Sequence, residues 1–118
     1  LIDNIFCLGR LDPLELKSWY SKTQFYLQLS NTEGFGVALC ESMLCECIPI
    51  VSKVNFLPNI IGDSGFILEK RNSDLLVDII KGALKSELSI LELKSRDRII
   101  DNFSFENRKS FLVSTLKS

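Results

Sequence analysis

Two glutamates and two glycines in one short segment are the residues best suited to chemistry. Glu33 precedes the glycines Gly34 and Gly36, and Glu41 follows within a predicted helix. Glycine lets the backbone approach a ligand closely and adopt positive φ. A helix that begins there presents unpaired N–H groups and the positive end of its dipole. This glycine turn, residues 33–37, predicts a phosphate or diphosphate site; the alternative is a turn that only requires glycine.

Glu41 lies in a helix predicted over residues 36–46. Its neighbours three and four residues away are apolar or small, namely Val37, Ala38, Leu44 and Cys45. We therefore expect Glu41 to face inward and to have a partner, because an unpaired buried carboxylate is costly. A vicinal diol such as that of ribose offers two hydroxyl donors. The alternative is a structural carboxylate bound by a backbone amide, and Glu46 is expected on a solvated face.

Glu33 stands on the other side of the glycines. It cannot face a phosphate without repulsion, so we expect it to contact a neutral sugar beyond the diphosphate. The order of acid, anion site and acid then matches a nucleotide diphosphate sugar, which presents sugar hydroxyls, phosphates and a ribose diol in turn.

Short apolar segments alternate with helical patterns along the chain. The predicted strands cover residues 5–8, 25–29, 48–51 and 66–68, and the predicted helices cover 13–21, 36–46, 73–84, 90–102 and 105–116. Such alternation predicts βαβ units and a parallel sheet covered by helices on both faces. Loops that follow parallel strands meet at one edge of the sheet, where ligands bind. The loops expected there are 9–11, 30–36 and 52–61.

Composition excludes several classes of protein. The 118 residues are 46% hydrophobic and 25% charged with a net charge of −1, which argues against disorder and against a nucleic-acid-binding surface. No apolar run reaches the length of a membrane span, and the first residues do not resemble a signal peptide. Because the chain starts without Met on a strand-like segment, we expect it to be a portion of a longer polypeptide.

The cysteines fit no zinc-binding template, and the chain contains no His. We expect buried, reduced thiols in a cytoplasmic protein at Cys7, Cys40, Cys45 and Cys47. Packing roles are expected for Trp19 and Phe103. Solvated positions are expected for the charged residues of the late helices, which are Lys81, Lys85, Glu87, Glu92, Lys94, Arg96 and Arg98.

The Glu33-x7-Glu41 spacing resembles the E-x7-E motif of retaining glycosyltransferases of the GT-B fold, the family 4 group. Five further segments resemble that family in the same order, namely Cys7–Arg10, Tyr20–Ser30, Pro49–Ser52, Leu57–Ile67 and Asn102–Glu106. The resemblance covers nearly the whole chain. It implies a Rossmann-like parallel sheet flanked by helices, the C-terminal half-domain of a GT-B fold, with residues 103–118 forming its terminal helix.

The resemblance also implies roles for individual residues. Glu41 would hold the ribose hydroxyls, and Glu33 would contact the transferred sugar, so that these two acids form the catalytic pair. The donor-binding residues would be Gly9, Arg10, Gly34, Phe35, Gly36, Val37 and Glu41. Backbone N–H groups of the glycine turn would contact the sugar and diphosphate, and Gly9 and Arg10 would lie near the base.

The implied reaction is sugar transfer from a nucleotide diphosphate donor with retention at the anomeric carbon. It would need no metal and no other cofactor. The acceptor, a glycan or a lipid-linked sugar, would bind an N-terminal domain that is absent from residues 1–118. The resemblance further implies peripheral membrane association of the full-length enzyme, and the apolar stripe of the last helix predicts weak self-association of this chain.

Some features depart from the family's pattern. Its Arg and Lys that neutralise the diphosphate lie upstream of this chain, and Arg10 does not match them. Asn55–Pro58 replaces a glycine-rich approach, and Asn59 stands where Glu is common. These departures leave open a non-catalytic or truncated copy.

Two other classes of protein are disfavoured. A dinucleotide-binding domain lacks its third glycine, which Leu39 replaces, and lacks an acid after the strand that ends near Ser52. A sugar-nucleotide epimerase of the same fold would need further acid–base residues, and the chain offers no His.

Overall fold

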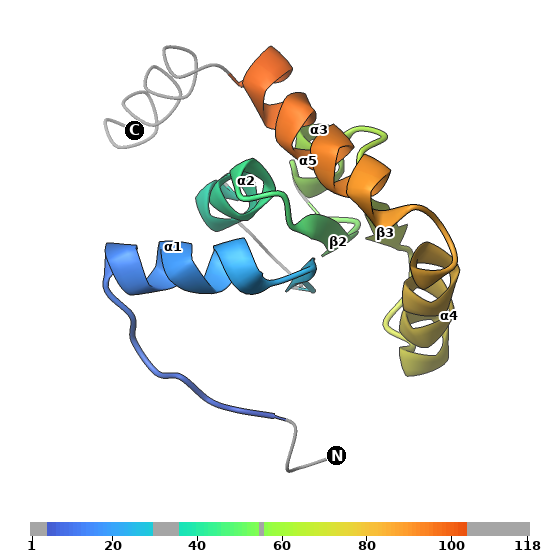
Figure 1. Ribbon diagram of the computed structural model, residues 1–118. Helices are drawn as coiled ribbons and strands as arrows, with labels where there is room; N and C mark the ends of the chain where they lie inside the picture. The colour runs from blue at the N-terminus through green and yellow to red at the C-terminus, as the bar shows by residue number, and fades with distance from the viewer. Residues whose placement is uncertain (1–4, 30–35, 55, 104–118) are drawn as a thin grey trace.

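Three parallel strands form the central sheet of the computed structural model, which describes residues 5–29, 36–54 and 56–103. In spatial order they are β1 (Phe25–Gln28), β2 (Ile48–Ser52) and β3 (Phe66–Leu68), seen in Figure 1. Tyr26 pairs with Pro49, and Val51 pairs with Ile67. Residues 48–51 of the central strand are all buried, as a parallel strand covered on both faces requires. The predicted α/β class is confirmed.

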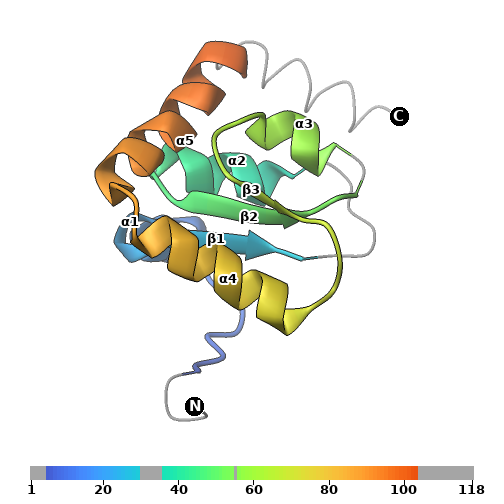
Figure 2. The ribbon, with the colours of Figure 1, turned by 90° about the vertical axis from the view of Figure 1, so that its right-hand side faces the viewer.

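Helices connect and cover these strands. They are α1 (Pro13–Lys22), α2 (Val37–Leu44), α3 (Leu57–Ile61), α4 (Ser73–Leu84) and α5 (Leu88–Asn102). Figure 1 and Figure 2 show α2, α3 and α5 on one face of the sheet and α4 on the other face, beside β3. α1 packs against α2. This arrangement places α2, the helix that follows the glycine turn, at the centre of the face that α2, α3 and α5 cover.

The helix starts follow the local signals expected from the sequence. Asp12 accepts a hydrogen bond from the Glu15 N–H at 2.9 Å, which lowers the pKa of Asp12 and caps α1. Pro13 occupies the first turn, where its missing N–H costs nothing. Asn72 caps α4 in the same way, by accepting from the Asp74 N–H at 2.8 Å.

The main core lies between the sheet and the helices α2, α3 and α5. Its buried members come from α2, α3, β2 and α5, and include Leu39, Met43, Val51, Leu57, Ile60, Ile61 and Ile99. Phe103 packs against this cluster, which agrees with its predicted packing role. Trp19 instead is 46% exposed, and the Lys22 ammonium lies 5.9 Å from the centre of its ring. The core therefore depends on α2 and α3, the two helices next to Gly36.

The strand predicted over residues 5–8 is wrong. Residues 5–9 form neither strand nor helix, and Ile5, Phe6, Cys7 and Leu8 are exposed. Figure 1 shows this segment leading away from the sheet. An apolar run becomes a β-strand only when a neighbouring strand accepts its hydrogen bonds, and no described strand lies beside it. The expectation that Cys7 is buried is wrong for the same reason.

Three other predictions need correction or lie outside the described residues. The loop predicted over 52–61 contains α3, in which Pro58 occupies the first turn. The helix predicted over 36–46 ends at Leu44, and Glu46 is partly buried with a left-handed φ of 70° instead of lying on a solvated helix face. The predicted terminal helix, 105–116, lies outside the described residues.

Candidate functional site

Gly36 is the N-cap of α2 and stands at the carboxyl edge of the sheet. Its φ of 67° and ψ of 31° are left-handed, a region that glycine enters without steric cost. Because glycine has no side chain, Gly36 offers no side-chain hydrogen bond to the first N–H groups of α2. Helix N-termini commonly bind anions through such N–H groups, which makes the start of α2 a candidate anion site.

Gly36 is also in close contact with α3. A Cβ placed on Gly36 would lie 2.8 Å from Ile60 Cδ1 and 3.3 Å from Leu57 Cδ2. Both distances are shorter than ordinary van der Waals contact, so a larger residue would force the ends of these two α3 side chains to shift. The structure therefore requires glycine here twice, for backbone conformation and for space.

Glu41 faces α1 and is half-buried. The stripe of α2 that is buried in the core consists of Leu39, Cys40, Ser42 and Met43. The prediction that Glu41 lies on the stripe of α2 that faces the core is therefore wrong. The residues three and four positions away from Glu41, which share its helix face, are themselves only partly buried. Glu41 instead lines a cavity of about 430 Å³ between the two helices.

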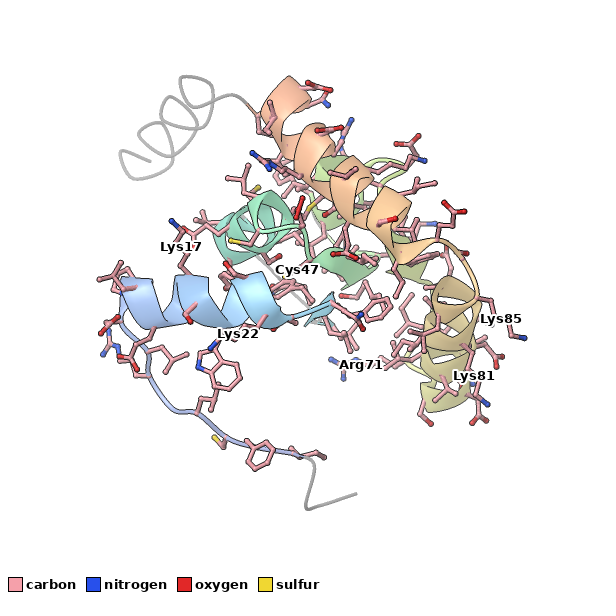
Figure 3. All side chains as sticks on the ribbon, in the orientation of Figure 1. Lys17, Lys22, Cys47, Arg71, Lys81 and Lys85 are labelled. Carbon is pink, nitrogen blue, oxygen red and sulfur yellow. The ribbon has the colours of Figure 1, made fainter. Side chains whose placement is uncertain are left out.

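This α1–α2 cavity is mainly apolar. It is lined by Leu11, Pro13, Leu16, Lys17, Tyr20, Glu41, Leu44 and Cys45. The pKa of Tyr20 is raised by burial and, to a lesser extent, by the negative charge of Glu41. Figure 3 shows Lys17 on the side of α1 that faces α2. An apolar cavity with a few polar groups is the usual form of a small-molecule site.

Gly9 and Arg10 are exposed and directly precede Leu11, a residue of the cavity wall. Gly9 has a φ of 70°, and a Cβ placed on it would meet nothing within 4 Å. The sequence expected both residues near the base of a nucleotide. Gly9 and Arg10 lie just before the start of α1, but the strand predicted over residues 5–8, which was expected to position them, does not form.

The remaining predicted site residues, Glu33, Gly34 and Phe35, lie outside the described residues. Within the described part of the chain, no group of three or more His, Cys, Asp or Glu side chains could hold a metal ion. No helix among residues 5–29, 36–54 and 56–103 combines the length and apolar character needed to cross a membrane.

A second, smaller cavity of about 170 Å³ lies where the three strands end. Its lining residues lie at or just after the ends of β1, β2 and β3, and include Leu29, Ser52, Lys53, Glu69, Lys70 and Arg71. Lys53 and Glu69 form an exposed ion pair at 3.4 Å. Figure 3 labels Arg71 beyond the end of β3. This edge was predicted as the ligand-binding edge, but the residues after β3 were not included.

The wall that α1 contributes to this α1–α2 cavity was not predicted from the sequence. Leu16 and Lys17 stand three and four residues after Pro13, and Tyr20 stands four and three residues after them. This spacing places the four residues on one helix face. That spacing was visible in the sequence. What it could not reveal is that this face lies opposite Glu41, because α1 and α2 are far apart along the chain.

Solved structures with this arrangement define the class of protein. The C-terminal domain of a glycosyl transferase group 1 family protein from Francisella tularensis superposes with a TM-score of 0.68 at 26% identity, over 86% of this chain and 53% of that one. Sucrose-phosphate synthase from Thermosynechococcus elongatus superposes with a TM-score of 0.75 at 23% identity, over 97% and 30%. The fold is that of the C-terminal domain of GT-B glycosyltransferases.

The amino-acid sequence then gives the family. Residues 1–103 match the family "Glycosyl transferases group 1", and the chain belongs to it. It is 28% identical to O-antigen chain mannosyltransferase B of Escherichia coli over 112 residues, and 32% identical to an uncharacterized glycosyltransferase of Methanocaldococcus jannaschii over 88 residues. These matches cover 93% and 73% of this chain, which spans 29% and 25% of those relatives.

Proposed function

We propose that this chain is the donor-binding part of a hexosyltransferase that uses a nucleotide diphosphate sugar. The observation that best supports the proposal is the pairing of a glycine-capped helix start with Glu41, one turn further along the same helix, in a chain of this family. The helix start suits the diphosphate. The α1–α2 cavity, with Glu41 in its wall, suits the nucleoside half of the donor.

The proposed mechanism follows the family 4 pattern, with retention at the anomeric carbon. Glu41 accepts hydrogen bonds from the ribose hydroxyls, and Glu33 contacts the transferred sugar. Within the glycine turn, the backbone N–H groups of Gly34 to Val37 stabilise the leaving diphosphate. We propose that the reaction needs no metal, because positioning and these hydrogen bonds supply the stabilisation.

The acceptor and cellular setting are proposed from the relatives. The Escherichia coli relative is an O-antigen chain mannosyltransferase, which supports a hexose donor and a glycan or lipid-linked acceptor for this protein. Because this chain spans about a quarter of its relatives, we propose that the acceptor binds a separate N-terminal domain. We further propose a cytoplasmic enzyme that associates peripherally with a membrane.

Glu41→Gln and Glu41→Ala in the full-length protein test the ribose role. We expect each to weaken nucleoside diphosphate binding by about 1–3 kcal/mol, the range for a lost hydrogen bond to a charged group. Isothermal titration calorimetry with uridine, guanosine and adenosine diphosphates measures this. Glu46→Gln is the matched control, since Glu46 is also a partly buried acid but does not line the cavity. Unchanged affinity in both Glu41 variants would reject the role.

A further inference from the structure

Arg98 on α5 binds the last turn of α3, although the sequence predicted a solvated side chain. Its Nε donates to the Ile60 carbonyl at 2.9 Å, and its Nη2 donates to the Asn59 carbonyl at 2.6 Å. The last carbonyls of a helix have no partners within the helix, and the planar guanidinium can bind two of them at once. Arg98 therefore closes the C-terminal end of α3 from a helix about forty residues away in sequence.

Gly62 provides the space in which the guanidinium lies. It is the C-cap of α3, with a left-handed φ of 56°. A Cβ placed there would lie 2.7 Å from Arg98 Cζ, so the guanidinium rests directly against this part of the backbone. The Phe103 ring centre lies 5.9 Å from the same Cζ. Packing and two hydrogen bonds together restrain the position of Arg98.

The helix that Arg98 holds is the helix that contacts Gly36. Leu57 and Ile60 are buried, and their side chains occupy the space where a Cβ of Gly36 would stand. Ile60 thus connects the two sites directly, because its carbonyl binds Arg98 and its side chain contacts Gly36. Since protein interiors are close-packed, a shift of α3 changes the surroundings of Gly36.

We infer that Arg98 is a positioning residue for Gly36 and the start of α2, which it supports through α3. By holding α3 against Gly36, it keeps the first N–H groups of α2 directed toward the donor diphosphate. This inference rests on the proposed function, because the direction of those groups matters only if the turn binds an anion. Arg98 acts through Ile60 and not by contact with the donor.

Arg98→Ala in the full-length protein tests this role, with Arg96→Ala as the matched control because Arg96 is an exposed arginine on the same helix. We expect Arg98→Ala to weaken nucleoside diphosphate binding on the order of tenfold, the effect of losing about one backbone hydrogen bond to the diphosphate. Arg98→Lys should fall between, since an ammonium cannot match two carbonyls with a planar fork. Hydrogen exchange in α3 should be faster in Arg98→Ala.

Ala83→Gly separates positioning from general loss of stability. Ala83 is buried in α4, on the opposite face of the sheet, and glycine there destabilises that helix. We expect this variant to melt at a lower temperature and to bind nucleoside diphosphates normally. If it binds as weakly as Arg98→Ala, the effect is one of stability and the inference is overturned.

Two other outcomes also decide the matter. Normal diphosphate affinity in Arg98→Ala, even with faster exchange in α3, would leave Arg98 a purely structural residue and overturn the inference. If the unaltered protein binds none of the uridine, guanosine and adenosine diphosphates, the proposed function fails and the role of Arg98 fails with it. If Arg98→Ala does not fold, the same comparison is made with Arg98→Lys.

Discussion

Gly36 meets two requirements that no other residue type meets at the same position. Its φ of 67° is strained for residues with a Cβ, and the space that a Cβ would need is taken by Ile60 and Leu57. The same position begins α2, so conformation and packing together determine where the first N–H groups of that helix point. At the residue scale, the candidate site depends on the absence of a Cβ at Gly36.

Replacing Gly36 by Ala should lower stability by about 1–3 kcal/mol, through left-handed strain and overpacking. The control is Gly82→Ala in α4, where a new Cβ meets nothing within 4 Å. That change should raise stability by about 0.5–1 kcal/mol, because alanine favours helix. Urea unfolding of the two variants measures both effects. Equal effects of the same sign would contradict this account of Gly36.

Cys47 joins three elements where β2 begins. Its Sγ donates to the Tyr20 carbonyl at 3.2 Å and lies 3.5 Å from the Thr23 carbonyl, at the end of α1. Ser95 of α5 donates to the Cys47 carbonyl. Burial raises the pKa of the Cys47 thiol to about 11. At the element scale, Cys47 holds the end of α1 through its neutral thiol and holds α5 through its backbone carbonyl.

This raised pKa predicts how stability depends on pH. The folded state favours the protonated thiol, whereas the unfolded chain releases the proton near the ordinary value of 9.0. The stabilising contribution is therefore complete below pH 9 and is lost as the pH rises toward 11. Urea unfolding at several pH values should show a steeper decline between pH 9 and 11 for the unaltered chain than for Cys47→Ser. Parallel declines would contradict the assignment.

Large apolar side chains remain exposed at the N-terminal side of the molecule. Phe6 is 77% exposed and Leu14 is 81% exposed, and Ile5 and Trp19 lie in the same part of the chain. Apolar surface of this kind is common at interfaces between proteins or domains. At the scale of the whole molecule, this chain presents surface that a partner domain or a second copy could cover.

We therefore expect weak self-association of the 118-residue chain, which the sequence predicted from its last helix. Multi-angle light scattering over a range of concentrations should show an average mass that rises with concentration. Phe6→Ser combined with Leu14→Ser should reduce that rise, because both side chains are exposed and apolar. A monomer at every concentration would contradict the expectation for both segments.

The sequence by itself determined the order and type of most elements. Alternating apolar strands and helices predicted the parallel sheet, and Asp12 and Asn72 marked helix starts through local hydrogen bonds. Gly36 was recognisable as a turn residue because left-handed backbone together with close approach strongly favours glycine. These features depend on residues that are near one another in the chain, so the sequence was sufficient for them.

Tertiary structure decided the features that depend on distant partners. Residues 5–8 had the pattern of a strand but no described neighbour to pair with, and Glu41 faces α1 because α2 buries a different stripe in the core. In the sequence, Arg98 resembles any exposed charged residue of a helix. Its hydrogen bonds to α3 follow only from the tertiary structure. The residue pattern of a segment sets what it can form, whereas pairing, facing and capping depend on which other segment lies next to it.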